Sequence, residues 1–299
     1  MAEQYLKGKR VIITGANSGI GFETAKKLAI KGAQVILAVR DIEKGNQAII
    51  DLKAGNPDIS VQMMLLDLAD LKNVRAFAES YCKQFDSLDI LINNAGVMIP
   101  PYSKTKDGFE LQFGGNHLGH FALTGLLLPL LKKTINSRVV TVSSLAHRGA
   151  SINFDNLDGS KGYSAMKFYG QSKLANLLFS KELDNRLKIS GIKTLSIACH
   201  PGISATNLFR MGGKLFKPIV TIIVNKFTQP ASMGALPTIY AATENSLVGG
   251  EYIGPDGKRN RKGYPAIEHP ASGVYNENTM KKLWDISEQL TGVKYDFSS

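Results

Sequence analysis

The chain has 299 residues, of which 43% are hydrophobic and 20% charged, so it can bury a core and is not a disordered protein. Lysines and arginines number 36 against 25 aspartates and glutamates, and the resulting charge of +11 suits anionic ligands. Two cysteines without a CxxC pair fit a reducing compartment, and we find no apolar run of the ~20 residues that span a bilayer, nor a signal peptide. We therefore expect a cytoplasmic globular protein.

Short apolar runs alternate with stretches of helical spacing along the first 200 residues. The expected strands are RVIIT (10–14), QVILAV (34–39), VQMMLL (61–66), LDILI (88–92), RVVTVS (138–143) and KTLSIA (193–198). The expected helices lie at 20–30, 42–52, 71–85, 111–131 and 168–187. Strands that are apolar throughout predict a sheet covered on both faces, and the alternation predicts an α/β, doubly wound, mostly parallel (Rossmann-like) sheet.

No linker interrupts this pattern, so we expect a single domain over residues 1–299. Its dinucleotide-binding part would cover about 8–200. A substrate lid would follow at about 203–228, and a C-terminal extension at about 258–299.

A glycine-rich turn, TGANSGIG (14–21), follows the first expected strand and opens the first helix. Glycines there let the backbone approach a pyrophosphate, to which the helix N-terminus offers free N–H groups and a positive dipole. The alternative is a tight turn without a ligand, which three glycines in this context make less favoured. We expect cofactor contacts from Gly15, Asn17, Ser18, Gly19, Ile20 and Gly21.

The residues that close the second strand indicate which dinucleotide binds. An acid there would bind the ribose hydroxyls of NAD, whereas a cation would accept the 2′-phosphate of NADP. Arg40 can fork onto a phosphate, and Asp41 is placed to cap the next helix. We therefore favour NADP; the alternative is NAD, with Arg40 in solvent and Asp41 on the ribose.

Seven elements, in order, resemble the short-chain dehydrogenases/reductases over about residues 8–257. They are TGANSGIG, Asp67, NNAG (93–96), Asn116 in GGNHLGHF, VSS (142–144), YGQSK (169–173) and PGISAT (201–206). NHLGHF, SSLAHR and YGQSKLANLLFSKEL resemble the retinol dehydrogenase-like branch, which includes reductases of retinal and other lipid aldehydes, many of them NADP-dependent. The resemblance implies further cofactor contacts from Asp67, Leu68, Asn94, Ala95, Gly96, Tyr169, Lys173, Pro201, Gly202 and Thr206. It also implies the catalytic set Asn116, Ser144, Tyr169 and Lys173.

The pattern Tyr-x-x-x-Lys needs care because it occurs four times, as Tyr5/Lys9, Tyr102/Lys106, Tyr163/Lys167 and Tyr169/Lys173. The first two lie in a leader and a Pro/Lys-rich loop. The family pattern usually has Ser just before the Lys, which Ser172 satisfies and Met166 does not. Tyr169/Lys173 is therefore preferred, with Tyr163/Lys167 as the rival.

Proton transfer at neutrality requires a phenol with a pKa below its usual ~10. A shift of about three units corresponds to roughly 4 kcal/mol, which an ammonium ~4 Å away supplies at an effective dielectric of ~20. We expect Lys173 to lower the pKa of Tyr169 in this way, with help from the positive nicotinamide during alcohol oxidation.

The remaining site residues follow from the resemblance. Ser144, rather than its neighbour Ser143, is expected to hold the substrate oxygen, and Asn116 a water that passes protons to Lys173; otherwise Asn116 is a helix-packing residue. Pro201 and Gly202 would close over the nicotinamide, and Thr206 would touch its carboxamide. The interval from Ser144 to Tyr169 exceeds the family's usual one, so residues 151–167 are expected to form a loop near the substrate.

Other features are interpreted as structural. We expect no metal site at His117 and His120, a buried Cys199, and a solvated loop at the basic run 258–262, hence no nucleic-acid partner. Residues 215–227 are apolar and predict a lid over an apolar substrate. The alternative, that this segment rests on a membrane surface as a peripheral contact, is not expected but stays open, as does a homo-oligomer.

The sequence thus predicts an NADP(H)-dependent oxidoreductase for the carbonyl or alcohol of an apolar small molecule, such as a retinoid-like or other lipid aldehyde. The alternatives are an NAD-dependent secondary-alcohol dehydrogenase and a dinucleotide-binding regulator without turnover.

Overall fold

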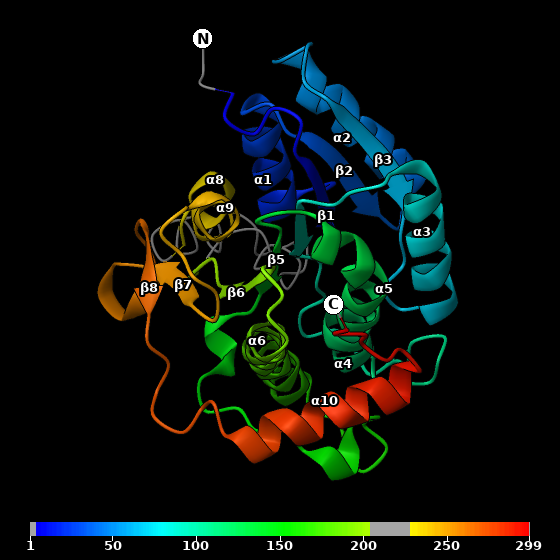
Figure 1. Cartoon of the computed structure of the whole chain (residues 1–299). Coiled ribbons are helices and arrows are strands. Elements are labelled where there is room, and N and C mark those ends of the chain that lie inside the picture. The colour runs from blue at the N-terminus through cyan, green and yellow to red at the C-terminus, as the bar shows by residue number, and fades with distance from the viewer. Residues whose placement is uncertain (1–3, 204–227, 299) are drawn as a thin grey trace, which may run out of the picture.

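The computed structural model describes residues 4–203 and 228–298, which fold as one central sheet between two layers of helices (Figure 1). The sheet has eight strands in the order β3-β2-β1-β4-β5-β6-β7-β8, all parallel except that β8 runs antiparallel to β7. They are β1 (Arg10–Thr14), β2 (Gln34–Val39), β3 (Val61–Leu65), β4 (Ile90–Asn93), β5 (Arg138–Val142), β6 (Leu195–Cys199), β7 (Tyr252–Pro255) and β8 (Pro265–Glu268). The six predicted strands and the doubly wound class are confirmed, whereas β7 and β8 were not predicted.

The strands are apolar at nearly every position because successive residues face opposite sides of the sheet, and both sides are covered. On β1, Val11 and Ile13 join the core on one face with Leu28, while Ile12 joins the core on the other face with Phe121. Both faces are covered, so no position of the strand can be polar without a partner.

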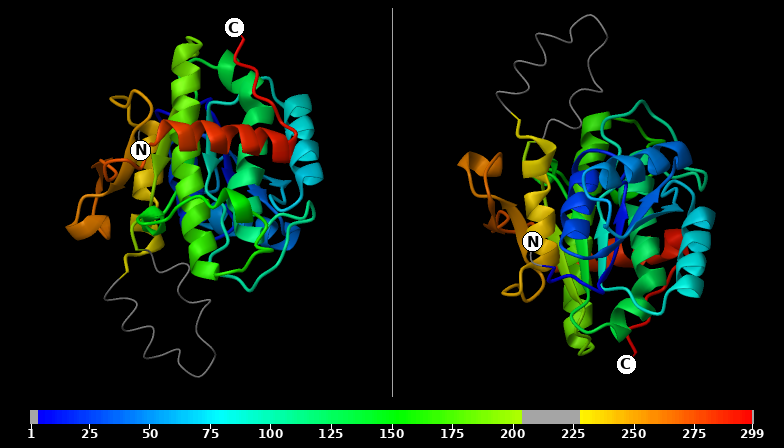
Figure 2. Two further views of the ribbon diagram at one scale, coloured as in Figure 1. Left: turned by 90° about the horizontal axis from the view of Figure 1, so that it is seen from below. Right: turned by 90° about the horizontal axis from the view of Figure 1, so that it is seen from above.

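The helices divide between these faces (Figures 1 and 2). One face carries α1 (Gly19–Ile30), α2 (Ile42–Ala54) and α9 (Leu236–Thr243), with the short α8 (Ala231–Gly234) beside α1. The other carries α3 (Leu71–Gln84), α5 (Gly119–Lys133) and α6 (Ala165–Ile189). Short helices are α4 (Leu111–Phe113), η1 (Gly114–Leu118), η2 (Leu145–His147), η3 (Phe154–Asn156) and η6 (Lys258–Asn260).

The helix predicted over 111–131 is interrupted, which corrects the sequence-based expectation. Its first residues form α4, the next five form the π-helical η1, and α5 follows directly. A π turn holds an extra residue, and such bulges are frequent at functional sites. Hydrophobic periodicity did not distinguish it from an α-helix, because η1 is buried at Gly114, Asn116, His117 and Leu118 alike.

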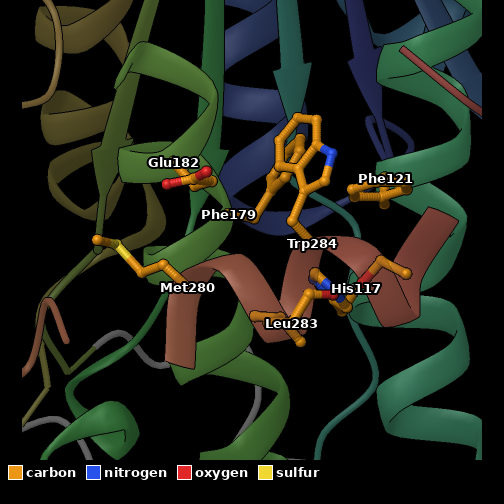
Figure 3. Close-up of a pocket in the computed structure, with 8 residues that line it drawn as sticks. His117, Phe121, Phe179, Glu182, Met280, Leu283 and Trp284 are labelled. Atoms are coloured by element: carbon orange, nitrogen blue, oxygen red, sulfur yellow. Dashed lines mark hydrogen bonds between the residues drawn. The ribbon is translucent and has the colours of Figure 1, made fainter. Parts of the chain in front are cut away.

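The C-terminal α10 (Glu277–Thr291) crosses the outer side of α6 and α5 (Figure 2). Trp284 lies among aromatic side chains of both helices, with its ring centroid 5.1 Å from that of Phe121 and 6.0 Å from that of Phe179. The pocket at this seam (Figure 3) has no room for a water molecule, so it is a packing contact rather than a ligand site.

Among the helices of the described residues, none combines the length and apolarity needed to cross a bilayer.

Candidate active site

The glycine-rich turn lies between β1 and α1 and adopts the backbone that glycine favours. Gly15 and Gly19 have φ of +66° and +59°. A Cβ on Gly15 would lie 3.0 Å from the Cα of Ala95, and one on Gly21 would lie 2.6 Å from the Nδ2 of Asn94. The turn can therefore press against the loop after β4 only if these positions have no side chain.

The N-terminus of α1 is open to an anion. Ser18 stands at the N-cap, yet its side chain makes no capping hydrogen bond, and the first turn holds no acidic residue. Free amides and a positive dipole there fit a pyrophosphate. This chain's residues therefore fit a nicotinamide dinucleotide, and Gly19, Ile20 and Gly21 form the turn that would face its phosphates.

The loop after β4 is fastened to the end of β1 through Thr14. The backbone N–H groups of Asn94 and Ala95 both donate to Thr14 Oγ1 at 2.9 Å, and the Asn94 side chain donates to the Thr14 carbonyl at 2.8 Å. The two strand ends that are expected to bind one cofactor are thus held in a fixed relation.

Arg40 and Asp41 have separate roles at the end of β2. Asp41 caps α2, because its carboxylate accepts from the Lys44 backbone N–H and pairs with the Lys44 ammonium, and these interactions lower the pKa of Asp41. The Asp41 cap was predicted and is confirmed. Arg40 is exposed and makes no hydrogen bond or ion pair with the described residues, so its guanidinium is available to a ligand.

Asp67 and Leu68 follow β3. The Asp67 carboxylate accepts from the Ala69 N–H at 3.0 Å, while the Asp67 N–H donates to the Asn73 side chain at 2.7 Å. These bonds turn the chain tightly at the carboxyl ends of the strands, where the other predicted cofactor residues lie. Leu68 packs on the core beneath.

The four catalytic candidates lie together at the carboxyl ends of β4 and β5. Tyr169 and Lys173 are on α6, with the Lys173 Nζ 5.9 Å from the Tyr169 ring centroid. Ser144, the N-cap of η2, lies close enough to the Tyr169 phenol to act on its pKa. A Cβ on Gly96 would lie 3.3 Å from the Lys173 Nζ and 3.4 Å from the Asn116 Oδ1, so this glycine leaves the ammonium and the amide facing the β4 loop.

Burial dominates the electrostatics of this cluster. It raises the pKa of Tyr169, which the hydrogen bond with Ser144 partly offsets, and it lowers the pKa of Lys173 to about 8. The expectation that Lys173 lowers the pKa of Tyr169 is therefore wrong for the protein alone. Desolvation of the buried phenolate is the largest influence on this pKa and outweighs the effect expected of the ammonium.

Two further contacts fix Lys173. Its Nζ donates to the Val142 carbonyl at 3.1 Å, and its own backbone carbonyl accepts from the Ser143 hydroxyl at 2.7 Å. The Ser143 hydroxyl is thus occupied by its hydrogen bond to the backbone of α6, whereas Ser144 is the serine near Tyr169. Asn176 also donates to the Val142 carbonyl, at 3.2 Å.

The Asn116 amide is held from three sides. Its Oδ1 accepts from the Val97 N–H at 2.8 Å, and its Nδ2 donates to the Val97 carbonyl at 2.9 Å and to the Ser172 hydroxyl at 3.0 Å. Both amide protons are used, so any water at Asn116 would donate to one of its oxygens rather than accept from its nitrogen.

The rival Tyr163/Lys167 is not brought together at the cluster. The Tyr163 hydroxyl donates to the Pro100 carbonyl at 2.8 Å and accepts from Gln112 at 3.1 Å, while Lys167 is exposed. Tyr163 thus fastens the 151–167 segment to the loop after β4.

Pro201 and Gly202 follow β6 as predicted. Gly202 has φ of +65° and donates its N–H to the His200 Nδ1 at 3.1 Å, and the next residue, Ile203, bonds the Arg261 carbonyl at 2.8 Å. Thr206 and the lid expected at 203–228 fall almost entirely outside the described residues.

The features interpreted as structural have defined places. Cys199 is fully buried, as predicted. His117 bonds Ser287 of α10, whereas His120 bonds Thr14, and no group of three metal-ligating side chains gathers within residues 4–203 and 228–298. In the basic run, Lys258, Arg259 and Arg261 are exposed and line a surface hollow of about 320 Å³.

Sequence reasoning assigned no role to Thr14, Asn176, His200 or Glu268, and it interpreted His120 only as a packing or capping residue. Thr14 opens the glycine motif, which was a usable signal. The other four act through partners distant in sequence, such as His200 with Glu268, so only the fold reveals them.

Comparison with known proteins identifies the family. The family model described as short chain dehydrogenase matches residues 9–211. Human retinol dehydrogenase 11 is 43% identical over 291 residues, covering 97% of this chain and 88% of the relative. Retinol dehydrogenase 12 of Mus musculus is 42% identical over 293 residues, covering 97% and 89%.

Solved structures give the same result. The crystal structure of an uncharacterised Mycobacterium paratuberculosis protein superposes with a TM-score of 0.81 at 42% identity, covering 97% of this chain and 96% of that chain. A Pseudomonas aeruginosa RhlG/NADP complex superposes with a TM-score of 0.65 at 25% identity, covering 84% and 96%.

The fold and site are those of an oxidoreductase that binds a nicotinamide dinucleotide. The chain belongs to the short-chain dehydrogenase/reductase family, and within it to the retinol dehydrogenase-like branch.

Proposed function

We propose that the protein is an NADP(H)-dependent oxidoreductase that interconverts the carbonyl and alcohol of an apolar small molecule, with a retinoid-like or other lipid aldehyde as substrate. The observation that carries the proposal is the placement of the Ser144 hydroxyl, the Tyr169 phenol and the Lys173 ammonium beside Gly96. The identity of the relatives, which are retinol dehydrogenases, supports the substrate class.

In this mechanism the chain binds the cofactor and the substrate, orients the substrate carbonyl and gives its oxygen a proton. The bound nicotinamide supplies the hydride in reduction and accepts it in oxidation. Ser144 donates a hydrogen bond to the substrate carbonyl oxygen and holds it at Tyr169, whose hydroxyl gives that oxygen its proton. The high pKa of the buried phenol keeps this proton on Tyr169 until the oxygen gains negative charge.

Lys173 and Asn116 support the proton donor. The ammonium, held at the Val142 carbonyl, stabilises the phenolate that remains after proton transfer. Asn116 fixes the β4 loop through Val97 and α6 through Ser172, and we propose that a water at one of its oxygens returns a proton toward Lys173.

Several sites complete the proposal. Pyrophosphate would bind at Gly15, Asn17, Ser18, Gly19, Ile20 and Gly21, the 2′-phosphate at Arg40, and the adenine and nicotinamide sides at Asp67, Leu68, Asn94, Ala95, Gly96, Pro201 and Gly202. The division into a dinucleotide-binding part, a lid and an extension, a cytoplasmic location and the absence of a nucleic-acid partner stay predictions.

Absorbance at 340 nm tests the function directly. We expect the wild-type protein to oxidise NADPH with all-trans-retinal or long-chain aldehydes, and NADH more slowly. Tyr169→Phe should lower kcat at least a hundredfold with little change in NADPH binding, because it removes only the proton donor.

Tyr163→Phe is the matched control, since Tyr163 begins the same kind of Tyr-x-x-x-Lys pattern six residues earlier. It should keep its turnover. An active Tyr169→Phe beside an inactive Tyr163→Phe would reverse the assignment. If NADPH raised the melting temperature of the protein but no carbonyl were reduced, the alternative of a dinucleotide-binding regulator without turnover would be favoured.

A further inference from the structure

A fully buried hydrogen bond joins the end of β1 to the first turn of α5. The Thr14 Oγ1 and the His120 Nε2 are 2.8 Å apart, and the two residues are 0% and 1% exposed. The other ring nitrogen of His120, Nδ1, is 2.9 Å from the backbone carbonyl oxygen of Asn116. One imidazole therefore spans from the cofactor-binding strand ends to a member of the catalytic cluster.

The protons of this contact can be assigned by counting. A threonine hydroxyl has one proton to donate and two lone pairs to accept with. Both lone pairs of Thr14 Oγ1 are used by the N–H groups of Asn94 and Ala95 at 2.9 Å. Its proton goes to the His120 Nε2 at 2.8 Å, since the other acceptor near it among the described residues, the Ile92 carbonyl, is 3.4 Å away.

The count fixes the tautomer of His120. Because Nε2 accepts, the ring proton sits on Nδ1 and is donated to the Asn116 carbonyl, which has no proton of its own to offer. Burial, with a smaller contribution from the charge of Lys173, lowers the pKa of His120 to about 4 despite the bond to Asn116. The ring is then neutral at pH 7, which agrees with one nitrogen, Nδ1, donating a proton and the other, Nε2, accepting one.

We propose that His120 is a positioning residue that couples the cofactor-binding loops to the catalytic cluster. Its Nε2 orients the Thr14 hydroxyl, which in turn holds the Asn94 and Ala95 amides. Its Nδ1–H anchors the carbonyl of Asn116, whose side chain contacts Val97 and Ser172. This inference rests on the proposed function only in taking a nicotinamide dinucleotide and Asn116 as parts of the working site.

The chain offers a matched control three residues away. His117 is equally buried and also bonds through Nε2, but its partner is the Ser287 hydroxyl of α10, at 2.9 Å. It lies in the seam with Trp284 and Leu283 (Figure 3). Loss of either imidazole removes one buried ring and its hydrogen bonding, but it is His120 whose two nitrogens bond Thr14 and the Asn116 carbonyl.

The two nitrogens of His120 can be tested separately. The amide nitrogen of Asn reaches about as far as the histidine Nδ1, whereas the amide oxygen of Gln reaches about as far as Nε2. His120→Gln should therefore keep the bond from Thr14, and His120→Asn the bond to the Asn116 carbonyl. His120→Phe keeps the ring and loses both.

We expect His120→Phe to raise the Kd for NADPH and to lower kcat about tenfold each, because buried groups on both sides lose their partner. His120→Gln should return the Kd to within about threefold of wild type, and His120→Asn should return kcat to a similar extent. His117→Phe should lower the melting temperature comparably but leave the Kd and kcat within about twofold. Equal loss of stability in both Phe variants, with unchanged Kd and kcat in His120→Phe, would overturn the proposal.

A nuclear magnetic resonance measurement on the wild-type protein tests the same contact without a variant. Long-range ¹H–¹⁵N correlation at pH 7 should show His120 protonated at Nδ1 and bare at Nε2. The opposite tautomer would overturn the proposal even if every variant failed to fold. If wild-type protein reduced no carbonyl, the proposed function would fail, while the Kd series and the tautomer would still decide whether His120 joins the cofactor loops to Asn116.

Discussion

At the scale of single residues, Arg40 and Asp41 show how neighbours with opposite charges divide one task. The Asp41 carboxylate is occupied by the N-cap of α2 and by Lys44, so it is poorly placed to read a ribose as well. Arg40 has no partner within the described part of the chain and keeps its donors for a ligand. Cofactor preference can thus rest on one side chain.

We therefore expect Arg40→Ala to raise the KM for NADPH about tenfold and to leave the KM for NADH nearly unchanged. A charge-assisted hydrogen bond is worth roughly 1.5–3 kcal/mol, and only NADPH carries the phosphate that would receive it. Initial rates with both cofactors measure the effect. Lys53→Ala, at an exposed cation at the far end of α2, is the control; a parallel rise in both KM values for Arg40→Ala would contradict a 2′-phosphate contact.

At the scale of elements, the antiparallel β8 is tied to the site by one buried carboxylate. Glu268 accepts from the His200 Nε2 at 2.7 Å and from Arg148 at 2.8 Å, and it thereby joins β8 to the residues that follow β6 and η2. Burial alone would raise the pKa of Glu268, but the hydrogen bonds from His200 and Arg148 outweigh it and hold the pKa below its usual value.

A carboxylate whose folded pKa is depressed stabilises the fold above its unfolded pKa of ~4.3, and this stability is lost as the pH falls through the folded pKa. We expect Glu268→Gln to lower the free energy of unfolding at pH 7 by about 1–3 kcal/mol. The difference from wild type should shrink below pH ~4. Urea denaturation at several pH values measures it, with Glu277→Gln, in an exposed pair with Lys281, as a nearly silent control. If the loss in the free energy of unfolding were the same from pH 7 to pH 3, the contribution of Glu268 to stability would not depend on its charge.

The elements also show where sequence reasoning succeeds and fails. The first six strands were predictable because burial on both faces forces continuous apolar runs, and the glycine turn because positive φ demands glycine. β7 and β8 escaped detection because YIGP and PAIE are short and contain Gly and Pro, which disfavour strands in isolation. The direction of the pKa shift of Tyr169 was not predictable from the sequence either. The spacing Tyr-x-x-x-Lys shows that two side chains share a helix face, but it does not show how deeply they are buried.

At the scale of the whole molecule, α10 closes the outer face of the α5–α6 pair. Trp284 is 2% exposed, its ring is 4.6 Å from that of Tyr295, and the Arg186 guanidinium lies over it at 4.3 Å. The Tyr295 hydroxyl donates to the Phe121 carbonyl at 2.6 Å, so the segment after α10 returns to the core. One aromatic cluster thus fixes the C-terminal region to α6, the helix that carries Tyr169 and Lys173.

Trp284→Ala should accordingly lower the free energy of unfolding by about 3–5 kcal/mol, through the lost contacts and the cavity left between helices. Turnover at 25 °C should persist, because Trp284 meets α6 at Phe179, ten residues from Tyr169 and hence about 15 Å along the helix. Chemical denaturation and kcat measured on one preparation separate the two effects. Asp285→Ala, at the exposed next position of α10, should leave both values unchanged. If kcat fell in Trp284→Ala well below its unfolding range, the aromatic cluster would be acting on the geometry of Tyr169 and Lys173, and not only on the stability of the fold.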